Sequence, residues 1–254
     1  MRKKIPNGYV LWKGASELDK KPIVLIVTGV KSASTNPKTG WMLQTWIMRS
    51  DMHPMAALHT NKDLSVCDSC PLRGDKGKQR ACYVNMATIG QIYNAYTRGL
   101  YPQLEDTSLL QSRPLRLGAY GDPAAVPFAV WKPILLAVDP TLHFSKTRSP
   151  LLEGTVRTGY THLWRRPKSK AFQRVCMASV ESPEARADAK EQGWRTYRIK
   201  HETDLVLPGE VVCPASKEAD NFAMTCTQCG LCGGTSVAGP DVVINVHGVR
   251  AQLF

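Results

Sequence analysis

The chain has 254 residues, of which 43% are hydrophobic and 21% charged, a composition typical of a folded globular protein rather than a disordered one. Thirty-three Lys and Arg residues against 21 Asp and Glu give a net charge of +12, which favours a polyanionic partner such as nucleic acid or a nucleotide. The longest apolar run, residues 22–30, is too short to span a bilayer, so no membrane partner is expected. No export signal is visible, and a cytoplasmic location follows as the expectation.

Strands and helices are predicted to alternate along the chain after a short, mobile basic arm at residues 1–4. Strands are predicted at 23–27, 41–48, 115–120, 160–164, 175–180, 194–199, 210–213 and 242–246, and helices at 86–100, 126–137 and 183–193. The first two strands flank turn residues 34–40 and predict a hairpin. The rest predicts an α/β fold in which a parallel sheet forms a barrel or partial barrel.

We expect a single domain over residues 1–254. The arm and hairpin occupy residues 1–50, and a cysteine-rich, metal-binding end occupies residues 213–254. Seven of the eight cysteines fall into two groups, and in a reducing compartment such groups indicate metal ligands rather than disulfides. The oligomeric state is left open.

The first cysteine group is Cys67, Cys70 and Cys82. Three thiolates could hold a [4Fe–4S] cluster and leave one iron open for a ligand, which chemistry requires. The alternatives are a zinc site or unligated thiols; a zinc site would be closed by a fourth ligand. The candidates for that ligand are His53, His59 and Cys176.

The second group is a strong metal signal because its cysteines are closely spaced and glycines follow two of them. Its members are Cys213, Cys226, Cys229 and Cys232. A zinc ion bound by four thiolates is favoured over a second iron–sulfur cluster, and His247 could replace Cys213.

Polar residues at predicted strand ends are the candidate active-site groups, because the carboxyl ends of parallel strands form the active face in such folds. Asp122 could bind an amine, act as a base, or cap the next helix. Ser179 and Glu181 could contact a ribose, although capping by Glu181 or Ser182 is the plainer role.

Trp164 and Arg165 combine an aromatic face with a guanidinium group, a pairing suited to holding a base and a phosphate. The alternative is that Trp164 is core and the arginine is solvated. His162 alternates with Trp164, so the strand register decides which of the two faces the site. No phosphate-binding glycine motif occurs, which disfavours ATP-driven chemistry and a dinucleotide fold.

Several of these motifs together resemble an uncharacterised bacteriophage family, the gene product 88 family. The resemblance extends from about residue 28 to the cysteine-rich end, and it implies a phage-encoded protein in a bacterial host cytoplasm. The motifs are the turn at 36–40, Cys67-x2-Cys70-Pro, Cys82-Tyr, Gly121-Asp-Pro123, Tyr160-Thr-His-x-Trp164, Ala178-Ser-Val180, Gly193-Trp-Arg195 and the terminal cysteine run.

The order of parts is also similar to that of radical S-adenosylmethionine (SAM) enzymes. That resemblance implies that the first three cysteines bind the cluster, that Asp122 binds the amine of SAM, and that Ser179 and Glu181 lie near its ribose. The chain departs from that pattern in its C-x2-C-x11-C spacing and in having aspartate where glutamate is usual.

Three functions follow as hypotheses. The leading one is a metalloenzyme that modifies nucleic acid or a nucleotide by [4Fe–4S]/SAM radical chemistry, with the substrate held by Trp164 and Arg165. The second is a base-exchange enzyme similar to tRNA-guanine transglycosylases, with structural zinc and Asp122 as nucleophile or base-recognition acid. The third is a non-catalytic zinc protein that binds nucleic acid.

Overall fold

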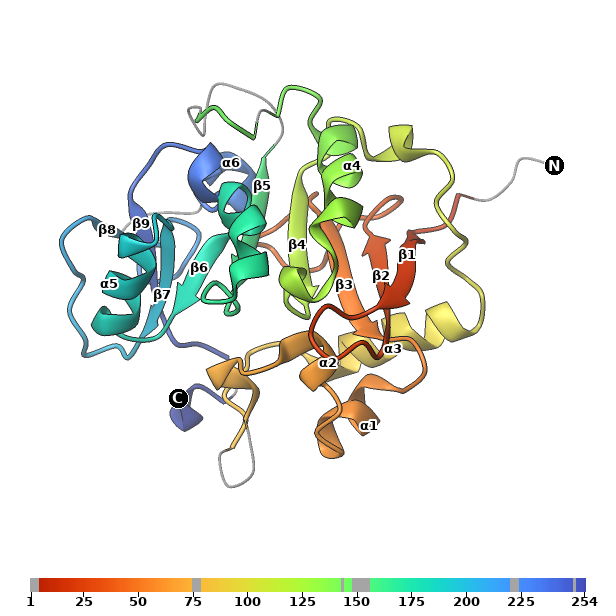
Figure 1. Cartoon of the computed structure of the whole chain (residues 1–254), viewed down its shortest axis with the longest axis horizontal. Helices are drawn as coiled ribbons and strands as arrows, with labels where there is room; N and C mark the ends of the chain where they lie inside the picture. Colours follow the sequence, from red (N-terminus) through yellow and green to blue (C-terminus); the bar gives the residue numbers. More distant parts are fainter. Residues whose placement is uncertain (1–4, 75–78, 143, 148–155, 220–223, 249) are drawn as a thin grey trace.

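A single nine-stranded sheet organises the molecule, with strand order β1-β2-β3-β4-β5-β6-β7-β9-β8 (Figure 1). The computed structural model describes residues 5–74, 79–142, 144–147, 156–219, 224–248 and 250–254, so the predicted arm at 1–4 lies outside the described residues. The strands are β1 (Gly8–Ala15), β2 (Pro22–Thr28), β3 (Leu43–Arg49), β4 (Leu115–Tyr120), β5 (Arg157–Thr161), β6 (Met177–Val180), β7 (Thr196–Lys200), β8 (Glu210–Val212) and β9 (Asp241–Asn245).

The sheet is antiparallel at one side and parallel over the rest. β1 pairs with β2 and β2 with β3 in antiparallel register, which confirms the predicted hairpin and adds an edge strand before it. All later pairs are parallel, as the alternation of strands and helices predicted. The strand order ends at β1 and β8, so the described sheet is open and its closure into a barrel is not observed.

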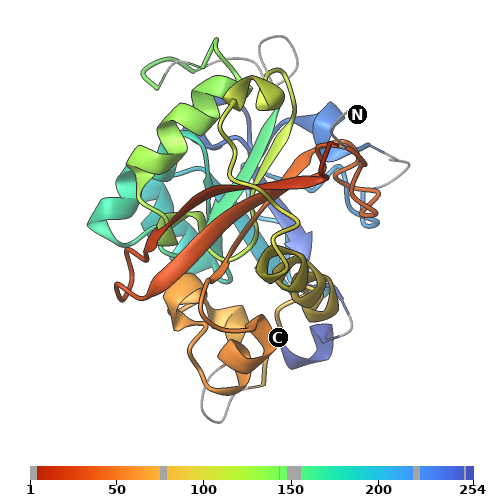
Figure 2. The ribbon, with the colours of Figure 1, turned by 90° about the vertical axis from the view of Figure 1, so that its right-hand side faces the viewer.

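The α-helices lie in the connections between the parallel strands. Residues between β3 and β4 form α1 (Pro54–His59), α2 (Leu64–Cys67) and α3 (Met86–Thr97), which gather at the end of the molecule where the C-terminal residues also lie (Figures 1 and 2). α4 (Phe128–Val138) follows β4, and α5 (Pro183–Glu191) follows β6. The last helix, α6 (Cys226–Cys229), lies within the second cysteine group.

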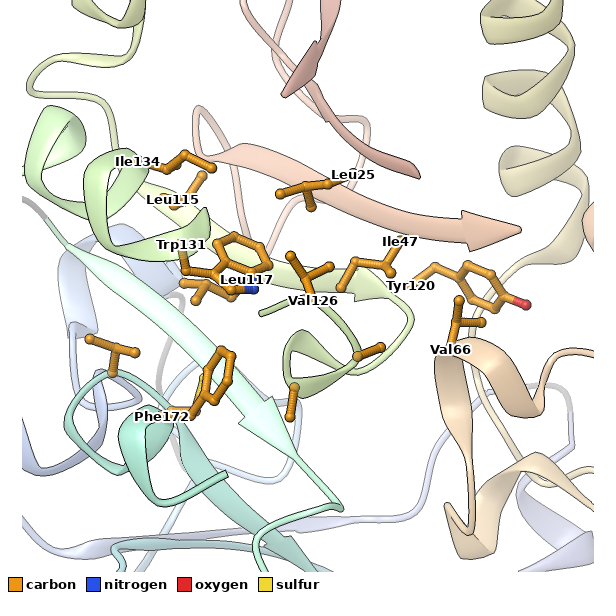
Figure 3. Packing of buried hydrophobic residues seen from close by; sticks show 14 of the residues in the cluster. Leu25, Ile47, Val66, Leu115, Leu117, Tyr120, Val126, Trp131, Ile134 and Phe172 are labelled. Atoms are coloured by element: carbon orange, nitrogen blue, oxygen red, sulfur yellow. The ribbon is translucent and has the colours of Figure 1, made fainter. Parts of the chain in front are cut away.

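The largest core lies between the sheet and α4. Trp131 is fully buried beside Leu117 of β4 and Val126 (Figure 3). Its indole N–H donates to the carbonyl of Pro123 at 2.9 Å, so the buried polar atom is satisfied. This packing fixes α4 against β4 and thereby the loop that joins them.

A second apolar cluster covers the opposite face. Met177 belongs to this cluster and Ala178 to the main core, as expected for successive residues of one strand. The second cluster includes Ile199 and Ile244, and cysteines of both groups belong to it or pack against it. Cysteines of both groups therefore meet on this face, whereas Cys67 packs against the main core.

The structure departs most from the predicted strands at β5 and β1. The strand predicted at 160–164 is β5, Arg157–Thr161, so Trp164 lies beyond its end. The glycine-containing segment Gly8–Ala15 was not predicted as a strand, and it forms β1 through pairing with β2. In both places the pattern along the chain is weak and pairing with neighbouring strands determines the register.

A buried ion pair links β7 to β8 across the intervening strand β9. Nε and Nη2 of Arg198 each contact a carboxylate oxygen of Glu210 at 2.7 Å, and these side chains are 2% and 0% exposed. The same carboxylate accepts a hydrogen bond from the Leu207 backbone N–H at 2.9 Å. Every charge in this pair is therefore compensated inside the protein.

We predict that Glu210→Gln lowers the free energy of unfolding by about 3–5 kcal/mol, because it leaves the buried Arg198 charge uncompensated. Glu17→Gln is the matched control, since Glu17 pairs with the exposed Lys20 and Lys168 and the change should cost about 1 kcal/mol or less. Urea unfolding followed by tryptophan fluorescence measures both. Equal losses would contradict the prediction.

Candidate functional site

The first cysteine group lines a cavity of about 100 Å³ at the carboxyl ends of β4 and β5. Cys67, Cys70 and Cys82 come from the connection between β3 and β4, while Asp122 and His162 directly follow the two strands. Residues that are up to 95 positions apart in the sequence, Cys67 and His162, thus line the same cavity.

Local backbone structure brings the three cysteines together. The Cys70 N–H donates to the carbonyl of Cys67 at 3.0 Å, which closes the turn after α2. The Cys82 N–H donates to the carbonyl of Leu72 at 2.8 Å, which fixes Cys82 to the segment directly after Cys70. Cys70 and Cys82 are thus held close by backbone hydrogen bonds, although eleven residues separate them in the sequence.

The three thiols interact electrostatically. Burial raises the pKa of Cys67 well above its usual value, and the neighbouring Cys70, Asp63, Cys82 and Asp122 raise it further. Burial also raises the pKa of Cys82, although Arg80 opposes this. Three thiolates in this place would therefore need a compensating cation.

The loop that carries Asp122 requires a glycine before it. Gly121 has φ +77°, and a Cβ there would lie 2.6 Å from the carbonyl oxygen of Ile47. The tight turn directs the Asp122 carboxylate back across the strand ends. The sequence Gly-Asp-Pro at this place is thus explained by backbone geometry, independently of any reaction.

Asp122 is held by three hydrogen bonds. Its Oδ1 accepts from the Ala124 N–H (2.9 Å) and the Thr161 hydroxyl (2.8 Å), and its Oδ2 accepts from the His162 N–H (2.8 Å). Burial raises the pKa of this carboxyl, although the hydrogen bonds and His162 oppose the shift. Asp122 caps the short 3-10 helix Pro123–Ala125 rather than α4, and its role in binding SAM stays a prediction.

His162 is a member of the site that the predicted residue set omitted. Its Nε2 lies 2.7 Å from Oε1 of Glu181, and Cys70 lines the same cavity. Burial acts to lower the pKa of His162, but Cys70 and Glu181 raise it well above its usual value. Its position directly after β5, beside the Gly-Asp-Pro turn after β4, is the signal that could have identified it.

The predicted fourth ligands of the first group lie elsewhere. His53 accepts a hydrogen bond from the Met55 N–H at 3.3 Å as the cap of α1 and packs edge-on against Tyr93. Cys176 is fully buried in the main core. The described cavity lining contains His162 and none of His53, His59 or Cys176, so His162 is the residue placed to approach these thiols.

Trp164 and Arg165 contact each other but line neither described cavity, so the predicted role of holding a substrate gains no support from their position. Trp164 is 2% exposed within the main core, and its indole N–H donates to the carbonyl of Ser179 at 3.1 Å. Arg165 stacks over the Trp164 ring at 3.8 Å and pairs with Asp188 of α5 at 3.0 Å. Trp164 is therefore a core residue, which is the alternative to a substrate-binding role. The reason is that β5 ends at Thr161, so Trp164 lies beyond the strand.

Ser179 and Glu181 lie at different depths. Ser179 is buried in β6, whereas Glu181 follows the strand and reaches the cavity through His162. The helix after them is capped by Ser182, whose hydroxyl accepts from the Ala185 N–H at 3.1 Å. Capping therefore leaves the Glu181 carboxylate available for another partner.

The second cysteine group assembles around α6. Burial raises the pKa of Cys213 to about 11, with Cys226 and Cys229 contributing. Burial and the thiols of the other three members raise the pKa of Cys232. The four thiols therefore interact electrostatically. His247 instead stacks on Tyr83 at 5.0 Å and contacts the carbonyl of Asn245.

The short helix α6 has a defined cap at each end. Thr225 and Gln228 form a capping box at its start, and Gly230 ends it in a left-handed conformation with φ 66°. The Gly159 N–H of β5 donates to the carbonyl of Cys232 at 3.1 Å, which fixes the last cysteine to the sheet.

In the described part of the chain, no group of three or more His, Cys, Asp or Glu side chains is arranged so that it could hold a metal ion. The metal and cluster assignments of both cysteine groups therefore stay predictions.

None of the described helices is long and apolar enough to cross a membrane. No family model, curated protein or solved structure matches the chain significantly.

We predict that Asp122→Asn lowers the free energy of unfolding by about 1–3 kcal/mol, because the new amide must face one of the three donors. Asp106→Asn is the matched control: Asp106 is an exposed cap that accepts from the Ser108 N–H, and asparagine caps nearly as well. Urea unfolding of the two variants, read by circular dichroism, tests this. A loss no larger at Asp122 than at Asp106 would refute it.

Proposed function

We propose that this protein is a metalloenzyme that modifies nucleic acid or a nucleotide, with an iron–sulfur cluster bound by Cys67, Cys70 and Cys82 and SAM as co-substrate. One observation carries the proposal: the three thiols line one cavity together with Asp122 and His162 at the carboxyl ends of parallel strands. In parallel α/β folds this edge is where ligands bind.

The donor set suits such a cluster. Three thiols line one cavity, and each thiolate of a [4Fe–4S] cluster binds a different iron, so the sulfurs need not surround a single ion. Held by the thiolates of Cys67, Cys70 and Cys82, such a cluster would supply one-electron reduction of SAM, the chemistry by which a carbon–sulfur bond is cleaved and a hydrogen atom is taken from a substrate. A one-electron reductant would have to restore the cluster.

The chain's own residues would orient the co-substrate. Oδ1 of Asp122 accepts two hydrogen bonds and Oδ2 accepts one, which leaves acceptor capacity on Oδ2 for the ammonium group of SAM. Glu181 is fixed by His162 and could accept a hydroxyl of the ribose. The apolar part of the cavity, which includes Leu72 and Val84, would exclude water.

The base-exchange alternative gains no support from this geometry. It requires Asp122 as a nucleophile or as an acid that reads the base, but three hydrogen bonds hold the carboxylate in place. Such bonds stabilise the carboxylate charge and reduce its reactivity.

The first test is the metal content of protein purified without oxygen. We expect about four iron and four sulfide per chain at the first group, and an absorption spectrum that changes when SAM is added. Cys67→Ala and Cys82→Ala should each abolish this iron. Cys176→Ala is the matched control, because Cys176 lies in the main core and should leave the iron content unchanged. Zinc alone in the wild-type protein would refute the proposal and favour the non-catalytic zinc protein.

The second cysteine group should hold its own metal, zinc or a second cluster. We predict that Cys229→Ala removes that metal and lowers the melting temperature, while the iron at the first group is retained. Cys70→Ala should give the reverse pattern. Elemental analysis of both variants checks this, and simultaneous loss of both metals in either variant would contradict two separate sites.

A further inference from the structure

A second cavity, of about 270 Å³, adjoins the first on the same face of the sheet. Tyr83 and Tyr160 line both cavities, so the two spaces meet at these rings. We call the second one the tyrosine cavity. The lining residues that matter here are Lys38, Tyr83, Arg116, Tyr160, Tyr197 and His247.

Two cations face this cavity without a carboxylate partner. Strand alternation buries Leu115 and Leu117 in the main core and turns Arg116 to the opposite face. Arg116 donates to the Tyr83 hydroxyl at 3.3 Å. Within the described residues, neither Arg116 nor Lys38 forms an ion pair, although Lys38 acts electrostatically on Glu218. A guanidinium placed in this way suits a phosphate or carboxylate of a ligand.

Aromatic rings form the walls beside these cations. The rings of Tyr160 and Tyr197 lie 4.4 Å apart, and Tyr83 stacks on His247 at 5.0 Å with an interplanar angle of 28°. Flat aromatic surfaces next to a cation are the features that hold a nucleobase and its phosphate. Both features are present in one cavity here.

The cysteines account for only one wall. Cys213 and Cys226 line the cavity, whereas Cys229 and Cys232 lie outside its described lining. A metal held by the four thiols would therefore sit at one side. The two cations and the tyrosine rings are not among its ligands, and they need another explanation.

We propose that the tyrosine cavity binds a nucleoside monophosphate, with its phosphate at Arg116 and Lys38 and its base against the tyrosine rings. This inference rests on the proposed function and narrows its substrate class from nucleic acid to a free mononucleotide. The shared Tyr83 and Tyr160 would bring the bound nucleotide next to the first cavity.

Isothermal titration calorimetry on the full-length protein with its native metals tests the proposal. AMP, GMP, CMP and UMP are the probes, and inorganic phosphate is the reference ligand. At least one nucleotide should bind more tightly than phosphate. Arg116→Gln should weaken that binding roughly 10- to 100-fold through loss of a charge-assisted contact. Arg98→Gln, an exposed arginine at the end of α3, is the matched control and should leave it unchanged.

A second variant keeps the test decisive if Arg116→Gln does not fold. Lys38→Gln changes a partly exposed loop residue and should weaken binding several-fold. The proposal is overturned if none of the four nucleotides binds at millimolar concentration, if a single-stranded oligonucleotide binds and no mononucleotide does, or if neither variant changes the affinity. Because calorimetry reads binding directly and requires neither SAM nor turnover, failure of nucleotide binding is distinguishable from failure of the radical chemistry.

Discussion

The buried carboxylate of Asp122 joins the segments that form the first cavity. Its three hydrogen bonds reach Ala124, Thr161 and His162, and its own N–H donates to the carbonyl of Val66, next to Cys67. One residue thus fixes the end of β4 to the end of β5 and to the helix that presents the first cysteine. Both the cysteine cavity and the position of His162 depend on this connection.

Because side chains alternate along the parallel strands, the two faces of the sheet carry different sets of residues. On one side, Trp131 and the leucines of β4 build the main core. On the other, Arg116, Tyr160 and five cysteines from the two groups lie over a smaller apolar cluster, while Cys67 packs against the main core. A change of register by one residue would exchange the two sets, so the packing of α4 indirectly maintains the site.

Charge compensation connects the two cysteine groups with the tyrosine cavity. Burial and neighbouring thiols raise the pKa of Cys67 and Cys232, so neither group favours thiolates without a cation. Arg116 lies near Cys226 and lowers the pKa of that thiol, in opposition to burial. Part of the chain's excess positive charge therefore lies inside the fold, at Arg116. There, an anionic ligand would compensate the guanidinium, and a metal would compensate the thiolates.

The sequence by itself determined the hairpin, the bounds of β4, the alternation of strands and helices, and the division of seven cysteines into two groups. These follow from local periodicity, turn residues and spacing. The tertiary structure decided the end of β5, which places Trp164 in the core, and the choice of His162 as the histidine beside Cys70. It also decided that Arg116 and three distant tyrosines enclose one cavity. The physical reason is that contacts between strands, set by long-range packing, determine register where apolar and polar residues alternate without a strong local preference.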